Sequence, residues 1–120
     1  NILNAAQLAM RRAVAQLNHF QDMVLVDGNI ARDFPCPTKT LLGGDGCSCS
    51  IAAASILAKV TRDRMCLLWD REYPQYGISA HKGYATKAHT EALRTYGPCP
   101  IHRKSFLTKI LAGTPFETEK

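Results

Sequence analysis

The chain of 120 residues fits one small domain, and its 46% hydrophobic and 21% charged residues are typical of a globular protein rather than a disordered segment. No apolar run reaches the roughly 20 residues of a membrane-spanning helix, and no signal segment opens the chain, so a cytoplasmic protein without a membrane partner is expected. The net charge of +5 favours an anionic partner such as nucleic acid, although many mildly basic proteins bind none. Five cysteines, an odd number with irregular spacing, argue against a disulfide framework.

The first part of the chain predicts a helix followed by two strands. Apolar residues recur at three- and four-residue steps over residues 3–17 and predict an amphipathic helix, with Leu3, Met10 and Leu17 on its apolar face. The apolar run 23–26 predicts a buried strand that ends in a turn. Residues 38–42 predict a second strand, which ends in a glycine-rich turn.

The second part predicts helices. A long helix is expected from about residue 48 to residue 72, with Ser48 or Ser50 as its N-cap. Its first half, residues 51–58, is apolar enough to be buried. A loop is expected at residues 77–84. A further helix is expected at 86–96, where Thr86 can cap its start and a glycine and a proline end it.

Together these elements place the chain in the α/β class. We expect one domain over residues 1–112 and a polar, frayed tail over 113–120. Two strands alone make a poor sheet, and a largely apolar strand needs partners on both sides. The sequence therefore predicts that part of the sheet is missing from this chain.

Two carboxylates stand out by their position. Asp27 follows the first predicted strand directly, and Asp45 lies in the glycine-rich turn after the second. Sites in open α/β sheets form at such strand ends, and neighbouring carboxylates call for a hard divalent cation that can activate water. Asp27 and Asp45 are therefore candidate catalytic and metal-ligating residues. The alternatives are an ordinary Asp-Gly turn at either position and a helix cap at Asp45.

A row of polar and basic residues marks one face of the long predicted helix. Its members are spaced seven, four and three residues apart, and they are Ser48, Ser55, Lys59 and Arg62. Hydroxyl groups and cations on one face suit successive phosphates of a nucleic acid. The alternative is a solvated edge on which Lys59 pairs with Asp63, four residues further on.

The segment His81-Lys82-Gly83-Tyr84 combines a base, a cation, a flexible joint and an aromatic ring. Such a group of residues suits stacking on a sugar and hydrogen bonding to a 2′-hydroxyl. Its alternative is a surface loop in which Tyr84 packs as a lid on the core. A zinc site at Cys99 and His102 is a further alternative, against which the irregular cysteine spacing argues.

These motifs resemble those of the ribonuclease HII family, in the family's order and over nearly the whole chain. The matching segments are VLVDGN at 24–29, GGD at 43–45, SIAAASILAKVTRDR at 50–64, YPQYG at 73–77, HKGY at 81–84 and HRKSF at 102–106. The long alanine-rich segment followed by HKGY is highly specific for the family. The resemblance implies an RNase H-like fold with a mixed central sheet flanked by helices, here truncated to about two strands and three or more helices.

The resemblance also implies an activity. The family hydrolyses the RNA strand of RNA–DNA hybrids and cuts at ribonucleotides embedded in duplex DNA, with four acidic residues around Mg²⁺ or Mn²⁺. Two of the four correspond to Asp27 and Asp45. The other two, an adjacent Asp-Glu pair followed by Gly-Arg-Gly, have no counterpart here, because the chain contains no Asp-Glu dipeptide. We therefore expect these 120 residues to lack the N-terminal segment of the domain and to be inactive alone.

For the substrate, the resemblance implies that Tyr84 reads the 2′-hydroxyl and that Lys82 and Lys59 contact phosphates. Ser55 and Ser48 complete the expected substrate-binding set. A monomer is expected. The alternative from another functional class is a non-catalytic module that binds RNA–DNA hybrids and does no chemistry.

Overall fold

The computed structural model of the chain describes residues 1–117. The chain divides into two compact units, Asn1–Ala58 and Lys59–Lys120. The boundary between them falls within the long helix α3 (Cys49–Glu72). The expected domain limit at residue 112 stays a prediction, and the end of the expected polar tail, residues 118–120, lies outside the described residues. No helix among the described residues has the length and apolar character needed to cross a membrane.

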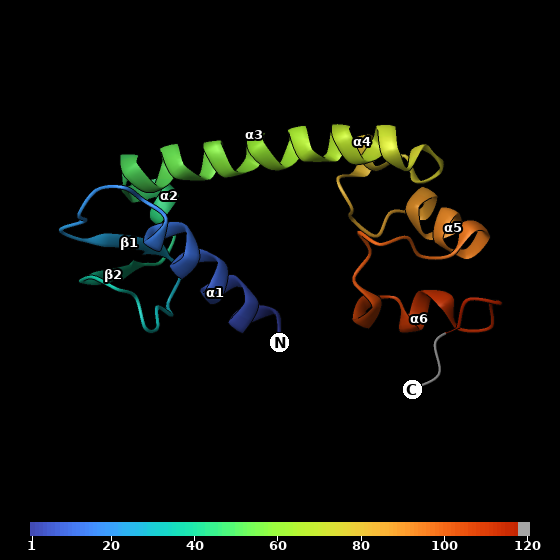
Figure 1. Ribbon diagram of the computed structural model, residues 1–120, viewed down its shortest axis with the longest axis horizontal. Coiled ribbons are helices and arrows are strands. Elements are labelled where there is room, and N and C mark those ends of the chain that lie inside the picture. The colour runs from blue at the N-terminus through green and yellow to red at the C-terminus, as the bar shows by residue number, and fades with distance from the viewer. Residues whose placement is uncertain (118–120) are drawn as a thin grey trace. The chain divides into compact units, whose positions relative to one another are not determined.

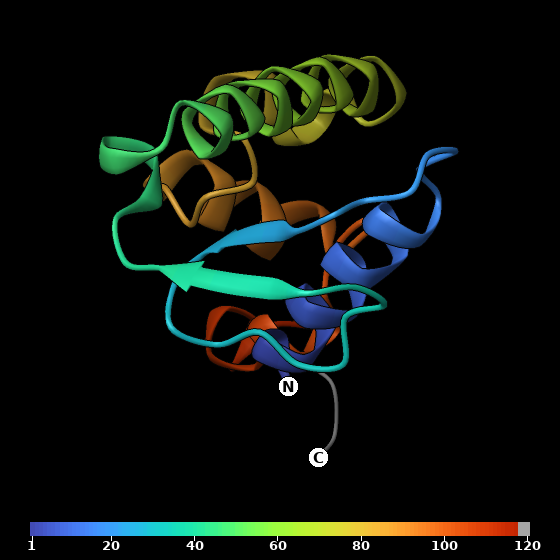
Figure 2. The ribbon, with the colours of Figure 1, turned by 90° about the vertical axis from the view of Figure 1, so that its left-hand side faces the viewer.

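The first unit contains a small parallel sheet, which confirms the α/β class (Figure 1). Helix α1 (Ile2–Ala15) precedes strand β1 (Val24–Asp27), and strand β2 (Thr38–Leu41) follows. The strands pair in register from Val24 opposite Thr38 to Asp27 opposite Leu41, side by side as Figure 2 shows. Because the strands are parallel, both carboxyl ends lie at one edge of the sheet.

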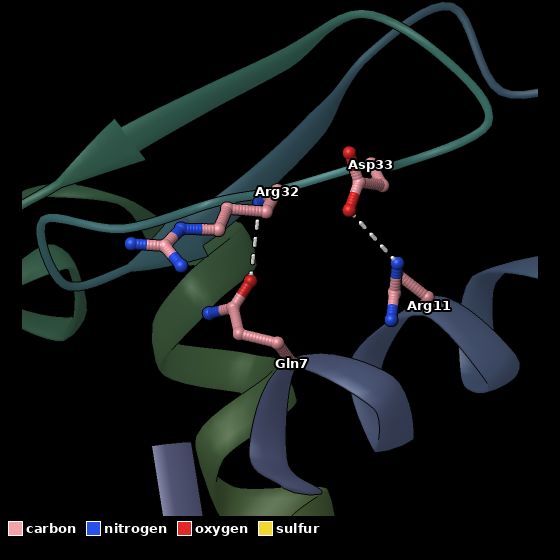
Figure 3. A network of polar contacts seen from close by, with 4 residues as sticks. All are labelled: Gln7, Arg11, Arg32 and Asp33. Carbon is pink, nitrogen blue, oxygen red and sulfur yellow. Dashed lines mark hydrogen bonds and ion pairs between the residues drawn. The ribbon is translucent and has the colours of Figure 1, made fainter. Parts of the chain in front are cut away.

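Helix α1 is anchored by polar contacts rather than by its apolar face. Its one buried side chain, Gln7, donates from Nε2 to the carbonyl of Ile30 at 2.9 Å and accepts from the amide of Arg32 at 3.2 Å. Figure 3 shows the second of these bonds beside an ion pair of 3.2 Å between Arg11 and Asp33. The predicted helix is confirmed, although it ends at Ala15 rather than at residue 17. Leu3 and Met10 on its expected apolar face are exposed, and so is Leu17, which lies beyond the helix.

The glycine-rich turn contains a short helix, α2 (Gly44–Cys47), with Asp45 in its first turn. Helix α3 then begins after Ser48, whose hydroxyl accepts a hydrogen bond from the amide of Ile51 at 3.4 Å, so the predicted N-cap is confirmed. The predicted burial of residues 51–58 is wrong for the described chain. Among the described residues of this segment, Ile51 is buried, whereas residues 53–58 are exposed.

The second unit has a continuous apolar core. After α3 come the 3₁₀ turn η1 (Pro74–Tyr76), helix α4 (Ile78–His81), helix α5 (Lys87–Tyr96), the 3₁₀ turn η2 (Lys104–Phe106) and helix α6 (Thr108–Leu111). The most buried members of the core are Cys66, Tyr76, Ile78, Leu93, Leu107 and Leu111. The predicted helix at 86–96 is confirmed, with Thr86 as its cap, while the predicted loop at 77–84 contains α4.

Candidate functional site

Asp27 and Asp45, the two predicted metal ligands, lie in one corner of the first unit. Asp27 is the last residue of β1, and its Oδ1 accepts a hydrogen bond of 2.9 Å from the amide of Gly44. Gly44 directly precedes Asp45 in α2. Next to this bond, the amide of Gly28 donates to the carbonyl of Leu41 at 2.8 Å and closes the end of the sheet. Two segments 17 residues apart are thus joined at the carboxyl edge of the strands.

Gly44 lies in close contact with the side chain of Ile51, so a larger residue at position 44 would force Ile51 to move. A Cβ atom there would lie 2.5 Å from Cδ1 of Ile51 and 3.5 Å from Oδ1 of Asp27. The same Ile51 is the buried residue of the α3 start. Ile51 therefore packs against Gly44, whose amide reaches the Asp27 carboxylate.

The carboxylates of Asp27 and Asp45 provide some of the ligands that a hard divalent cation requires. Asp27 and Asp45 are both exposed, and their carboxylate oxygens are the ligands that Mg²⁺ and Mn²⁺ prefer. Within residues 1–117, no group of three or more His, Cys, Asp or Glu side chains is arranged to hold a metal ion. The two aspartates would therefore supply only part of a coordination shell. Cys99 and His102 likewise belong to no three-ligand cluster among residues 1–117.

Three members of the polar row, Ser48, Ser55 and Lys59, make contacts within α3 or at its start. Ser48 caps the helix, and the hydroxyl of Ser55 donates to the carbonyl of Ala52 at 2.8 Å. Lys59 pairs with Asp63 at 2.6 Å, as the alternative interpretation predicted. This hydrogen bond raises the pKa of Lys59 and lowers that of Asp63. An exposed pair of this kind contributes little stability, so a phosphate would compete readily for Lys59.

Tyr84 does not pack as a lid on the core, because 67% of its surface is exposed. The guanidinium of Arg62 lies 5.6 Å from the centre of its ring. Arg62 also donates from Nη2 to the carbonyl of Lys82 at 2.5 Å, and Lys82 donates from Nζ to the carbonyl of Ser79 at 2.5 Å. The structure therefore places Lys82, Tyr84 and Arg62 together in the second unit. The sequence predicted the first two of these but offered no signal that Arg62 contacts Tyr84.

A cavity of about 430 Å³ opens beside Tyr84 in the second unit. Apolar side chains such as Leu93, Phe106 and Ile110 form much of its wall. Its cationic members are Arg62, Lys82 and Arg103, and its lining includes no carboxylate. The surroundings of Tyr84 therefore combine apolar surface with positive charge, which suits a nucleotide.

Comparison with known proteins agrees with these features. The family model described as Ribonuclease HII matches residues 1–109. The ribonuclease HII of Caulobacter vibrioides (strain NA1000 / CB15N) is 59% identical over 103 residues, which are 86% of this chain and 49% of that protein. The ribonuclease HII of Alkaliphilus metalliredigens (strain QYMF) is 52% identical over 118 residues, with 92% of this chain and 57% of that protein covered. The chain thus spans about half the length of the curated relatives it matches.

Proposed function

This chain belongs to the ribonuclease HII family, and we propose that it contributes Asp27 and Asp45 to a metal-dependent endonuclease site. The substrates would be RNA–DNA hybrids and duplex DNA that carries an embedded ribonucleotide. One observation carries the proposal: the hydrogen bond from the Gly44 amide to the Asp27 carboxylate joins the two acidic segments at one sheet edge.

The two aspartates would hold Mg²⁺ or Mn²⁺ through their exposed oxygens. A bound divalent ion activates water and stabilises charge on the phosphate. Asp27 and Asp45 bring negative charge to the sheet edge, and the Gly44 amide keeps the Asp27 carboxylate oriented. Because the described residues offer no third ligand at this corner, we propose that the 120 residues alone bind the hybrid without cleaving it.

The second unit would recognise the substrate. The exposed ring of Tyr84 is placed to stack on a sugar and sense the 2′-hydroxyl that DNA lacks. Lys59 and Lys82 would contact phosphates, and Ser48 and Ser55 of the first unit would add hydroxyl donors. Phosphate contacts of this kind are independent of sequence and weaken as salt rises.

A chimera tests the proposal. In it, the matched part of the Caulobacter vibrioides relative, which is 59% identical, is replaced by this chain. We expect the chimera to cut a duplex with one ribonucleotide in Mg²⁺, whereas the 120 residues alone bind and do not cut. A chimera that retains the duplex without cutting it would favour the alternative, a non-catalytic hybrid-binding module.

Tyr84→Ala is expected to weaken binding of the chain to a duplex with one ribonucleotide by about tenfold, because the contact of Tyr84 with the 2′-hydroxyl is lost. Binding to the all-DNA duplex of the same sequence should change little. Fluorescence anisotropy of both labelled duplexes measures the two affinities. The matched control is Tyr96→Ala, which removes another exposed tyrosine of the second unit. Equal weakening of both duplexes by Tyr84→Ala would contradict a role in reading the 2′-hydroxyl.

A further inference from the structure

Two buried histidines lie beside Tyr84, and one of them contacts its backbone through the ring. His81 and His89 are buried, and their rings stack with centres 4.2 Å apart and planes 16° from parallel. The amide of Tyr84 donates to the carbonyl of His81 at 2.9 Å, and its carbonyl lies 2.9 Å from Nδ1 of His89. Both backbone groups of Tyr84 are therefore held, although its side chain is exposed.

The hydrogen bonds fix the tautomers of His89 and His102. A carbonyl only accepts, so Nδ1 of His89 carries a proton and donates to Tyr84. Nε2 of a neutral His89 is then an acceptor, and it lies 3.0 Å from Nε2 of His102. His102 must therefore be protonated at Nε2, which leaves its Nδ1 as an acceptor. The amide of Cys99 donates to this Nδ1 at 3.2 Å, and the thiol sulfur lies 3.0 Å away.

With both rings neutral, the bonds form one directional chain from Cys99 through His102 and His89 to the carbonyl of Tyr84. His81 follows the same logic. Its Nε2 lies 2.8 Å from the carbonyl of Tyr76 and must donate, while its Nδ1 accepts from the amide of Gly83 at 3.2 Å. Gly83 directly precedes Tyr84, so the His81 ring also fixes the backbone just before that residue.

We propose that His81, His89 and His102 form a clamp of neutral, fixed tautomers that positions Tyr84 and thereby sets selectivity for a ribonucleotide over DNA. The selectivity half of this inference rests on the proposed function. The ring of Tyr84 is exposed, with the Arg62 guanidinium over it, so packing on the core does not fix its position. The clamp on its backbone then determines where the ring meets a sugar, and the three histidines are positioning residues.

The charge state of the rings supports the clamp. Burial lowers the pKa of His89 and of His102, and for His102 the neighbouring His89 lowers it further. The titratable groups that face the two rings are His81, Cys99 and Tyr76, the last with its ring centre 4.8 Å from that of His102. The neighbouring His81 also lowers the pKa of both rings, whereas the hydrogen bond to the Tyr84 carbonyl raises that of His89.

Mild acid is therefore expected to destabilise the second unit. Because the pKa values of His89 and His102 are lowered in the folded state, the unfolded chain binds more protons as pH falls below the ordinary histidine value of about 6.5. The stability that the two neutral histidines contribute is complete above that pH. It is lost as pH falls toward their pKa values in the folded state. Thermal unfolding between pH 7.5 and 5.5, followed by the fluorescence of Trp69, measures it. The matched variant His19→Asn, at an exposed site, should keep the pH slope, and His102→Gln should reduce it.

Paired substitutions at position 89 test the clamp in the 120-residue chain. His89→Asn keeps an N–H donor near the position of Nδ1, whereas His89→Leu removes the donor and keeps an apolar side chain. We expect His89→Leu to lower the ratio of affinities for the ribonucleotide duplex over the DNA duplex by about fivefold, the worth of one hydrogen bond. His89→Asn should restore much of that ratio. An unchanged ratio in His89→Leu would overturn the clamp.

The NMR chemical shifts of the histidine ring nitrogens in the unaltered chain give an independent readout of the tautomers. We expect His89 as the Nδ1–H tautomer and His102 and His81 as the Nε2–H tautomers at neutral pH. Any other assignment overturns the inference even if a variant does not fold. The two proposals fail differently. Without a ribonucleotide preference in the unaltered chain, the proposed function fails and the selectivity role falls with it; a preference that Tyr84→Ala removes and His89→Leu leaves intact defeats the clamp alone.

Discussion

Asp27→Asn is expected to lower ribonucleotide-directed cleavage by the chimera by at least about 100-fold in Mg²⁺. The substitution removes one negative charge from the sheet edge, and a neutral amide oxygen is a weaker ligand for a hard cation. The amide oxygen of asparagine still accepts the hydrogen bond that Gly44 donates to Oδ1. The corner between β1 and α2 should therefore keep its shape, so that a loss of rate reports on the charge.

Initial rates across a range of Mg²⁺ and Mn²⁺ concentrations would measure this loss. If Asp27 is a metal ligand, the variant should need a higher metal concentration to reach half of its maximal rate. Asp45→Asn should behave in the same way. The matched control is Asp22→Asn, which removes an exposed carboxylate from the same unit without touching the corner. Normal turnover by Asp27→Asn in Mg²⁺ would remove that residue from the chemistry.

Local sequence signals predicted the elements well because capping and turn residues mark where these elements begin or end. Ser48 and Thr86 cap their helices through side-chain oxygens, and the helix at 86–96 ends before Gly97, as glycine and proline signals indicate. The predicted strand end at Asp27 was also close, since the structure includes that residue in β1. Capping and turn chemistry depend on a few neighbouring residues, and a sequence displays these directly.

Contacts between distant segments were less predictable. The sequence placed Asp27 and Asp45 at strand ends, but the hydrogen bond through Gly44 depends on how α2 docks against β1. The contact of Arg62 with Tyr84 spans 22 residues and has no periodic signature. Burial of residues 51–58 was predicted from composition alone, and it failed because burial depends on what packs against a helix rather than on the helix itself.

The histidine clamp shows the same limit at the level of chemistry. The sequence offered His81 as a base in a loop and His102 as an alternative zinc ligand, and it gave no role to His89. In the structure these side chains meet through nitrogens and carbonyls from three separate segments. A tautomer is set by its hydrogen-bond partners, so it became predictable only after the fold had brought those partners together.

Gly97→Ala is expected to lower the free energy of unfolding of the second unit by about 2–4 kcal/mol. Gly97 has φ +74° and ψ −177°, a backbone conformation that is almost restricted to glycine. A Cβ atom there would also lie 2.7 Å from the ring of Phe116, which packs against the core. The backbone shift that relieves this clash would strain the bond from the Tyr76 hydroxyl to the Gly97 carbonyl, 2.8 Å long and buried.

Urea unfolding followed by the fluorescence of Trp69, the one tryptophan, reports on this core directly. Gly113→Ala is the matched control, because Gly113 also has a positive φ of +73° but open space around it, so it should cost only about 1 kcal/mol. Combining Gly97→Ala with Phe116→Leu separates the two causes. If the ring clash matters, the double variant should be less destabilised than the sum of the single variants; strict additivity would assign the whole effect to the backbone conformation.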